Sequence, residues 1–122
     1  MQNYKELKVW QKSHNLTIDI YHATKSFPKE ELYGLTSQLR RSASSVGLNL
    51  VEGCGRFTNP DIVNFFQNSF SSAQETEYCL ILCKDLKYID IVLFNDFEER
   101  IEEIKKMLVG LIKKLRTVNS KL

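Results

Sequence analysis

Apolar residues recur at intervals of three and four along four segments of the chain. The segments cover about residues 5–26, 31–54, 60–87 and 91–118, and no strand-like alternation persists anywhere. This spacing places apolar side chains on one face of an α-helix. Because the connections are short, consecutive helices are expected to pack antiparallel. The pattern predicts an all-α fold, an antiparallel up-down-up-down four-helix bundle that occupies residues 1–122 as one domain.

Proline and glycine predict where these helices end. Phe27 precedes Pro28 and should close the first helix, because the residue before proline avoids the α region. Gly53, Gly55 and the polar residues after them should stop the second helix. Asn59 is predicted to cap the third helix, with Pro60 at the first helical position, where the missing N–H does no harm.

The second helix has two ordered stripes. The apolar stripe consists of Leu35, Leu39, Ala43, Val46, Leu50 and Gly53, and the polar stripe consists of Gln38, Arg41, Ser45, Asn49, Glu52 and Arg56. An amphipathic helix requires only the apolar stripe, so the polar one indicates pairing within or between protomers. Arg41 or Arg56 is expected to pair with Glu75 or Glu77 of the third helix. The alternative is that the polar stripe simply faces solvent.

The second half of the third helix is apolar on nearly every side, because Tyr78, Ile81, Leu82 and Leu86 lie away from its main stripe. A helix of this kind has to be covered all round, which a single bundle cannot do. We therefore expect a homo-oligomer. The residues predicted for the interface or for polar pairing are Arg41, Leu48, Asn49, Val51, Glu52, Arg56, Glu75, Glu77, Tyr78 and Leu82.

The composition is that of a soluble globular protein. Of the 122 residues, 43% are hydrophobic and 26% are charged, and the formal net charge is only +2. No apolar run approaches the ~18 residues of a membrane span. The first residues, MQNYKELKVWQK, carry charges where a signal peptide has its apolar core. We therefore expect a cytoplasmic protein with reduced cysteines and no membrane partner.

The placement of charge is more informative than its total. In an antiparallel bundle one end would collect Lys5, Lys8, Lys12, Arg56, Lys113, Lys114, Arg116 and Lys121. The opposite end would collect Glu30, Glu31, Asp85, Asp90, Asp96, Glu98 and Glu99. The basic end is a candidate contact for the phosphate backbone of RNA or DNA. Alternatively, the last cations only complement the dipole of the fourth helix.

No arrangement typical of catalysis or metal binding is recognisable. Glu75 and Glu77 should point about 160° apart on one helix, so they cannot converge. Cys79 and Cys83 lack the further ligands of a zinc site and are expected in the core. Cys54, in a connection, is the thiol expected to react most readily. We predict no catalytic residue, no metal and no cofactor.

Four stretches of the chain resemble a known family. They are VWQKS at 9–13, FPKEELYGLTSQLRRSASSVGLNLVEGCGR at 27–56, SFSSAQETEY at 69–78 and MLVGLIKKL at 107–115. They are similar to the bacterial four-helix bundle proteins known as large-subunit ribosomal RNA intervening-sequence proteins. The resemblance implies a protomer that assembles as a ring-shaped homopentamer. A related branch, the accessory variability determinant protein of diversity-generating retroelements, binds nucleic acid and a reverse transcriptase.

Together these observations predict a non-enzymatic, homo-oligomeric scaffold or protein-interaction module. Its partners would be further copies of itself and a protein encoded by a neighbouring gene. The alternative is a nucleic-acid-binding accessory protein that grips phosphates at its basic end without reading bases.

Overall fold

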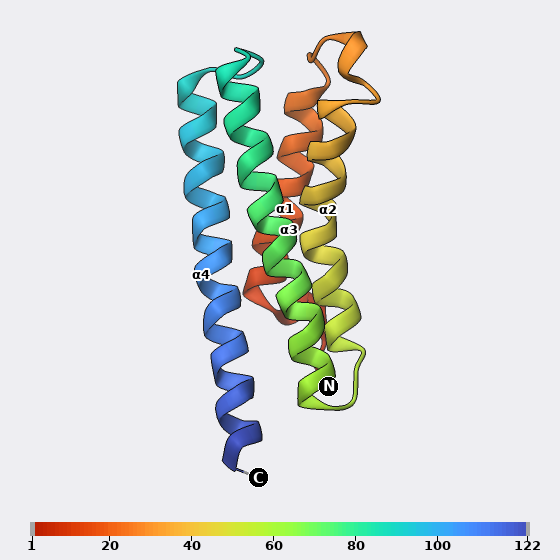
Figure 1. Ribbon diagram of the computed structural model, residues 1–122, viewed down its shortest axis with the longest axis vertical. Coiled ribbons are helices and arrows are strands. Elements are labelled where there is room, and N and C mark those ends of the chain that lie inside the picture. The colour runs from red at the N-terminus through yellow and green to blue at the C-terminus, as the bar shows by residue number, and fades with distance from the viewer. Residues whose placement is uncertain (1, 122) are drawn as a thin grey trace.

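Four long helices form a bundle in the computed structural model, which describes residues 2–121, with side chains to residue 117 (Figure 1). The helices are α1 (Lys8–Thr24), α2 (Leu35–Cys54), α3 (Asn59–Asp85) and α4 (Ile91–Lys121). Two short 3-10 helices, η1 (Tyr4–Glu6) and η2 (Lys29–Glu31), precede α1 and α2. No strand is present among the described residues, so the predicted all-α class is confirmed.

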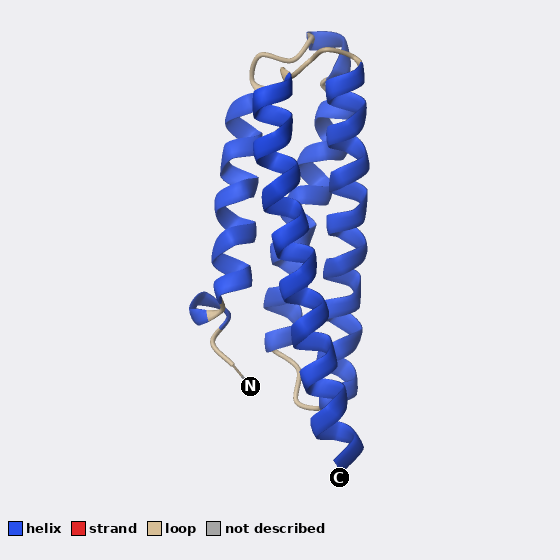
Figure 2. Ribbon diagram, turned by 90° about the vertical axis from the view of Figure 1, so that its left-hand side faces the viewer, coloured by secondary structure: helices blue, strands red, loops and turns tan. Residues whose placement is uncertain are grey.

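Each helix packs against two neighbours around the bundle. The contacting pairs are α1 with α2, α2 with α3, α3 with α4, and α4 with α1. Successive helices run in opposite directions (Figures 1 and 2). The start of α1, the α2–α3 turn and the end of α4 therefore share one end, and the other two connections share the opposite end. None of the described helices is both long and apolar enough to cross a lipid bilayer.

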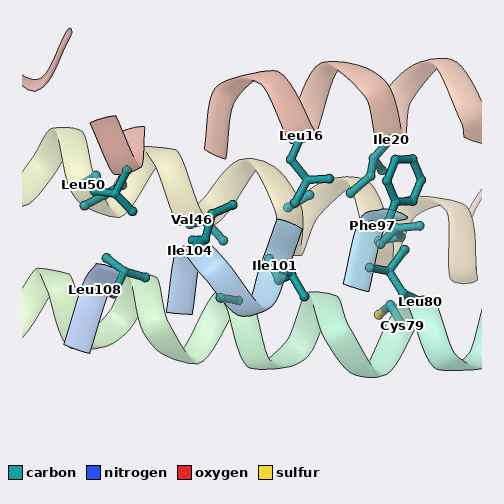
Figure 3. Packing of buried hydrophobic residues seen from close by; sticks show 14 of the residues in the cluster. Leu16, Ile20, Val46, Leu50, Cys79, Leu80, Phe97, Ile101, Ile104 and Leu108 are labelled. Carbon is teal, nitrogen blue, oxygen red and sulfur yellow. The ribbon is translucent and has the colours of Figure 1, made fainter. Parts of the chain in front are cut away.

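The apolar stripes of all four helices meet in one core (Figure 3). Its most deeply buried members include Leu16, Ile20, Val46, Leu50, Leu80, Ile101, Ile104 and Leu108. The α4 contribution follows the alternating three and four spacing that the sequence shows, as expected for left-handed bundle packing. Hydrophobic burial along this seam is what holds the bundle together.

Most helix boundaries differ from the expected ones by one to four residues: the first helix ends at Thr24 and the third at Asp85, two residues earlier than expected. α1 follows the η1 turn and an extended Leu7, and α2 begins at Leu35 because the backbone of Gly34 (φ −111°, ψ −115°) is not helical. Thr58, and not Asn59, caps α3: its Oγ1 accepts a hydrogen bond from the Asp61 N–H at 3.4 Å. The helix pattern of α4 continues to Lys121.

The α2–α3 contact is built from small residues and hydroxyl groups. Ser69 Oγ donates to the Val46 carbonyl at 2.7 Å, and Thr76 Oγ1 bonds Ser42 Oγ at 3.0 Å. Gly53 allows the closest approach, because a Cβ at that position would lie 2.7 Å from the Phe66 ring. These hydroxyls are fully buried yet satisfied, so they fix the register of the two helices without an unpaired polar group.

Candidate functional site

The outward surface of α2 and α3 holds most of the residues predicted for assembly. We define the α2–α3 outer face by Arg41, Leu48, Asn49 and Glu52 of α2 with Ser72, Glu75, Tyr78 and Leu82 of α3. At its centre Arg41 Nη2 lies 2.7 Å from Glu75 Oε2 and 3.0 Å from Gln38 Oε1. The Arg41 and Glu75 side chains are 59% and 38% exposed. Arg41 thus pairs within its own protomer, and the polar stripe is largely solvent-facing in the single chain.

Two large apolar side chains stand out of this polar face. Leu48 is 62% exposed and Tyr78 is 60% exposed, although both belong to long and well-packed helices. Around them the polar groups are already satisfied, since Asn49 donates to the Ser45 carbonyl and Ser72 donates to Ser45 Oγ. A face of uncovered apolar groups among satisfied polar groups is typical of a protein-binding surface.

Beside Leu48, a shallow groove runs between α1 and α2 and holds Val51. The ring of Trp10 stacks on His14, with centroids 5.1 Å apart and planes at 13°, and the edge of Tyr4 meets Trp10. Gly47 forms the opposite wall, where a Cβ would lie 3.5 Å from Trp10 Nε1. Leu48 and the half-buried Val51 both line this groove, so Leu48 lies where the groove meets the α2–α3 outer face and Val51 lies beside that face, on its α1 side.

Glu77 does not pair with either predicted arginine. It lies on the α4 side of α3, where Lys105 Nζ is 3.2 Å from Glu77 Oε1 and 3.1 Å from Glu102 Oε1. A hydrogen bond with Glu102, together with burial, raises the pKa of Glu77, whereas Lys105 opposes this rise. Glu75 and Glu77 therefore diverge toward different helices, as the 100° step per residue requires. This pairing fastens α3 to α4 and is not part of the outer face.

Two of the cations predicted for the basic end are paired with carboxylates, so its positive charge is smaller than the sequence indicates. Lys12 Nζ lies 3.1 Å from Glu103 Oε1, and Arg56 Nη2 lies 3.7 Å from Glu52 Oε2. The Arg56 guanidinium also lies over the Phe65 ring. The cations Lys5, Lys8, Lys113 and Lys114 are exposed and form no ion pair with a described residue. Arg116 lines a groove between α3 and α4 with Phe70 and Val109. The Lys121 side chain lies outside the described side chains.

The three cysteines are buried, including Cys54, which was expected to be the reactive thiol. Burial raises the pKa of Cys54 and Cys79, and it raises the pKa of Cys83 to about 12. A protonated thiol is a poor nucleophile and a poor metal ligand. The expected position of Cys54 in a connection is wrong, because the last turn of α2 places this residue in the core. At 8% it is still the most exposed of the three cysteines, so its expected rank as the most reactive thiol stays a prediction. The described residues contain no cluster of three or more His, Cys, Asp or Glu that could hold a metal ion.

Sequence reasoning missed the buried hydroxyls of the α2–α3 contact. Ser42, Ser69 and Thr76 are each 0% exposed, and their hydrogen bonds link α2 to α3. The available signal was their position on the apolar stripes, where a polar residue requires an explanation.

Comparison with known proteins agrees with this architecture. A solved structure from Bacteroides thetaiotaomicron, described as a protein with unknown function from the S23 ribosomal protein family, superposes with a TM-score of 0.80. The two chains are 28% identical over 86% of this chain and 95% of that one. Among curated proteins no match was found. The family model of the 23S rRNA-intervening sequence protein matches residues 5–110. The resemblance seen in the sequence is therefore confirmed, and this four-helix chain belongs to the 23S rRNA-intervening sequence protein family.

Proposed function

We propose that the protein is a non-enzymatic, homo-oligomeric scaffold whose subunits meet through the α2–α3 outer face. The observation that supports this most directly is the exposure of Leu48 and Tyr78, at 62% and 60%, on that face. Covering a leucine or tyrosine side chain contributes about 1.5–3 kcal/mol of hydrophobic free energy. In a homo-oligomer, a neighbouring subunit would cover Leu48 and Tyr78 on each chain.

Small and paired polar residues make the same face suited to close approach. Ser44 and Gly47 flank Leu48, so a neighbouring helix meets little steric obstruction there. Arg41 and Glu75 neutralise each other at the centre, so like charges do not oppose contact. A ring of five subunits is the assembly that the family resemblance implies. Such a ring would present identical surfaces to a protein partner encoded nearby.

Introducing a charge on the surface tests the proposal. Leu48→Glu and Val51→Glu should each reduce the mass measured by light scattering after size exclusion, with helix content unchanged by circular dichroism. Both residues line the α1–α2 groove, but Leu48→Glu is the cleaner variant, because Leu48 is 62% exposed whereas Val51 is half-buried. Tyr33→Glu is the matched control: Tyr33 is 95% exposed but lies in the α1–α2 connection, away from this face. A parent protein that is already monomeric, or variants of parent mass, would refute the proposed interface.

A second candidate function is sequence-tolerant binding of nucleic acid at the basic end. It is supported by the exposed Lys5, Lys8, Lys113 and Lys114, which no described carboxylate neutralises. In a ring these cations would act together, and their attraction for phosphates would add.

The salt dependence of binding distinguishes this function from a pure scaffold. Binding of a short RNA or DNA should fall steeply with salt and be lost when Lys113, Lys114 and Arg116 are changed to Glu. Reversal of the partly buried Glu98 and the exposed Glu99 to Lys, at the opposite end, provides the control. Absent or salt-insensitive binding of both nucleic acids would contradict this function and leave the scaffold proposal intact.

A further inference from the structure

A hollow of about 290 Å³ opens where the end of α1, the η2 turn and the start of α2 meet. This is the end of the bundle opposite the chain termini (Figure 1). Its lining includes Lys25, Phe27, Lys29, Leu32, Thr36 and Arg40. Neither the outer face nor the basic end described above includes any of these residues. The hollow is therefore separate from both of these surfaces.

Three cations border the hollow without a carboxylate partner. Lys25, Lys29 and Arg40 form no ion pair with any described residue. Arg40 is held in place, because its Nε donates to Thr24 Oγ1 at 2.8 Å and its guanidinium lies 4.8 Å from the centre of the Tyr21 ring. Its Nη2 also donates to the Tyr21 carbonyl at 3.4 Å, and the N–H donors that are left are offered by a guanidinium already held in place, at little entropic cost.

The two carboxylates of the η2 turn, Glu31 and Glu30, do not line the hollow. Glu31 accepts the Leu35 N–H at 3.1 Å with one oxygen and the Tyr88 hydroxyl at 2.8 Å with the other. These contacts direct it toward the α3–α4 connection, and Glu31 does not line the hollow. Glu30 is exposed on the surface of the η2 turn and does not line it either. The hollow is thus a local positive site within an end of the bundle that is otherwise acidic.

The start of α2 adds hydrogen-bond donors that lack acceptors. Thr36 lines the hollow, is only 2% exposed, and its hydroxyl has no hydrogen-bond partner. Gln38 N–H bonds the Gly34 carbonyl, but no hydrogen bond from the N–H groups of Thr36 or Ser37 is formed with the described residues. An N-terminal first turn with orphan donors attracts oxyanions, and the helix dipole adds to this attraction.

We propose that this hollow is a binding site for a small phosphomonoester. The phosphoryl group would meet the Arg40 guanidinium, the lysine ammonium groups and the donors of the α2 first turn. Its organic part would lie against Phe27, Pro28 and Leu32, which form the apolar part of the wall. A carboxylate carries a single charge, whereas a dianionic phosphate offers more charge and more acceptors to three cations and a hydroxyl. The acidic surroundings and the small volume favour a small ligand over a nucleic acid chain.

Titration with phenyl phosphate, followed by ¹⁵N–¹H NMR at constant ionic strength, tests the site. We expect saturable shifts confined to residues 24–40, with weaker shifts of the same amides from inorganic phosphate. Arg40→Gln, and separately Lys25→Gln with Lys29→Gln, should weaken binding about tenfold or more, since each change removes charge-assisted hydrogen bonds to the phosphoryl group. The lysine variants change only exposed side chains, so they protect the test against misfolding of the Arg40 variant. Lys8→Gln removes the same single charge as Arg40→Gln, but at the other end of the bundle, and should change nothing.

Thr36→Val separates a ligand-binding hydroxyl from a merely buried one. Removing an unsatisfied buried hydroxyl should leave the melting temperature unchanged or raise it. The same change should weaken phenyl phosphate binding severalfold if the hydroxyl contacts the ligand. The proposal fails if no saturable shifts occur by about 10 mM, a concentration well above a millimolar Kd. It also fails if the shifts spread over the basic end, or if the Arg40 and lysine variants bind like the parent.

Discussion

The inner side of α2 is buried in the core and the outer side is exposed to solvent, so different interactions determine which residues suit each side of this one helix. On the inner side, Leu39, Ala43, Val46, Leu50 and Gly53 are all buried. On the outer side, Arg41, Leu48 and Glu52 are exposed. Shape complementarity determines the inner side, where atoms have no room to move. On the outer side, solvent screens the interactions between charges, so these residues contribute little to the stability of the fold. Because they are accessible, they can instead contact a partner.

Truncating one leucine on each side of α2 gives the largest expected contrast. Leu50 is 0% exposed, so Leu50→Ala should lower the free energy of unfolding by about 2–5 kcal/mol. Leu48 is 62% exposed, so Leu48→Ala should change the intrinsic stability of the chain by no more than about 0.5 kcal/mol. Urea unfolding followed by circular dichroism measures both.

Assembly would blur this contrast, because binding to other subunits adds stability that depends on protein concentration. The unfolding midpoints should therefore be measured over a range of concentrations and compared at the lowest. Equal losses for the two variants at that limit would mean that Leu48 is part of the fold itself. The division between the two sides of α2 would then be wrong.

Periodicity predicted the inner side of α2 but not the partners on its outer side. The spacing from Leu39 to Gly53 identifies the buried positions, because a single helix contains all the information that the pattern needs. Pairing depends on the register between two helices, which the spacing along one helix does not contain. For this reason the sequence offered both Arg41 and Arg56 as partners of Glu75, of which the structure uses Arg41. The pairing of Glu77 with Lys105 was not predicted.

The predicted N-cap of α3 was wrong, because two neighbouring residues could both serve as the cap. Thr58 and Asn59 are both good helix caps, and the sequence alone favours the one directly before Pro60. The structure uses Thr58, and Asn59 Nδ2 instead reaches the Leu115 carbonyl of α4 at 3.5 Å. The candidate phosphate site was also out of reach of pattern reasoning, because α1, η2 and α2 meet only in the folded chain.

A pair of glycine substitutions tests how tightly the inner side is packed. A Cβ at position 53 would lie 2.7 Å from the Phe66 ring and 3.2 Å from Phe65 Cβ, so Gly53→Ala should destabilise by about 1–3 kcal/mol. Gly110, on α4, has nothing within 4 Å of such a Cβ. Gly110→Ala should therefore stabilise by up to about 1 kcal/mol through helix propensity alone. Thermal unfolding compares the two variants, and a gain in stability for both would show that the α2–α3 contact tolerates a methyl group.

The smallest effect is expected for the ion pair at the centre of the outer face. Arg41 and Glu75 are 59% and 38% exposed, so a double-mutant cycle of Arg41→Gln and Glu75→Gln should give a coupling of only about 0.2–1 kcal/mol. This coupling should shrink further at high salt, because solvent ions screen exposed charges.

Protein concentration makes the same cycle a probe of assembly. If subunits cover the α2–α3 outer face, the pair leaves water and its coupling strengthens, because a desolvated pair is less screened and its loss leaves an unpaired charge. The cycle should then give the small value in dilute protein and a larger, salt-resistant value in concentrated protein. A coupling that stays small at every concentration would place Arg41 and Glu75 outside any interface. Contact through this face would then depend on its apolar side chains, chiefly Leu48 and Tyr78.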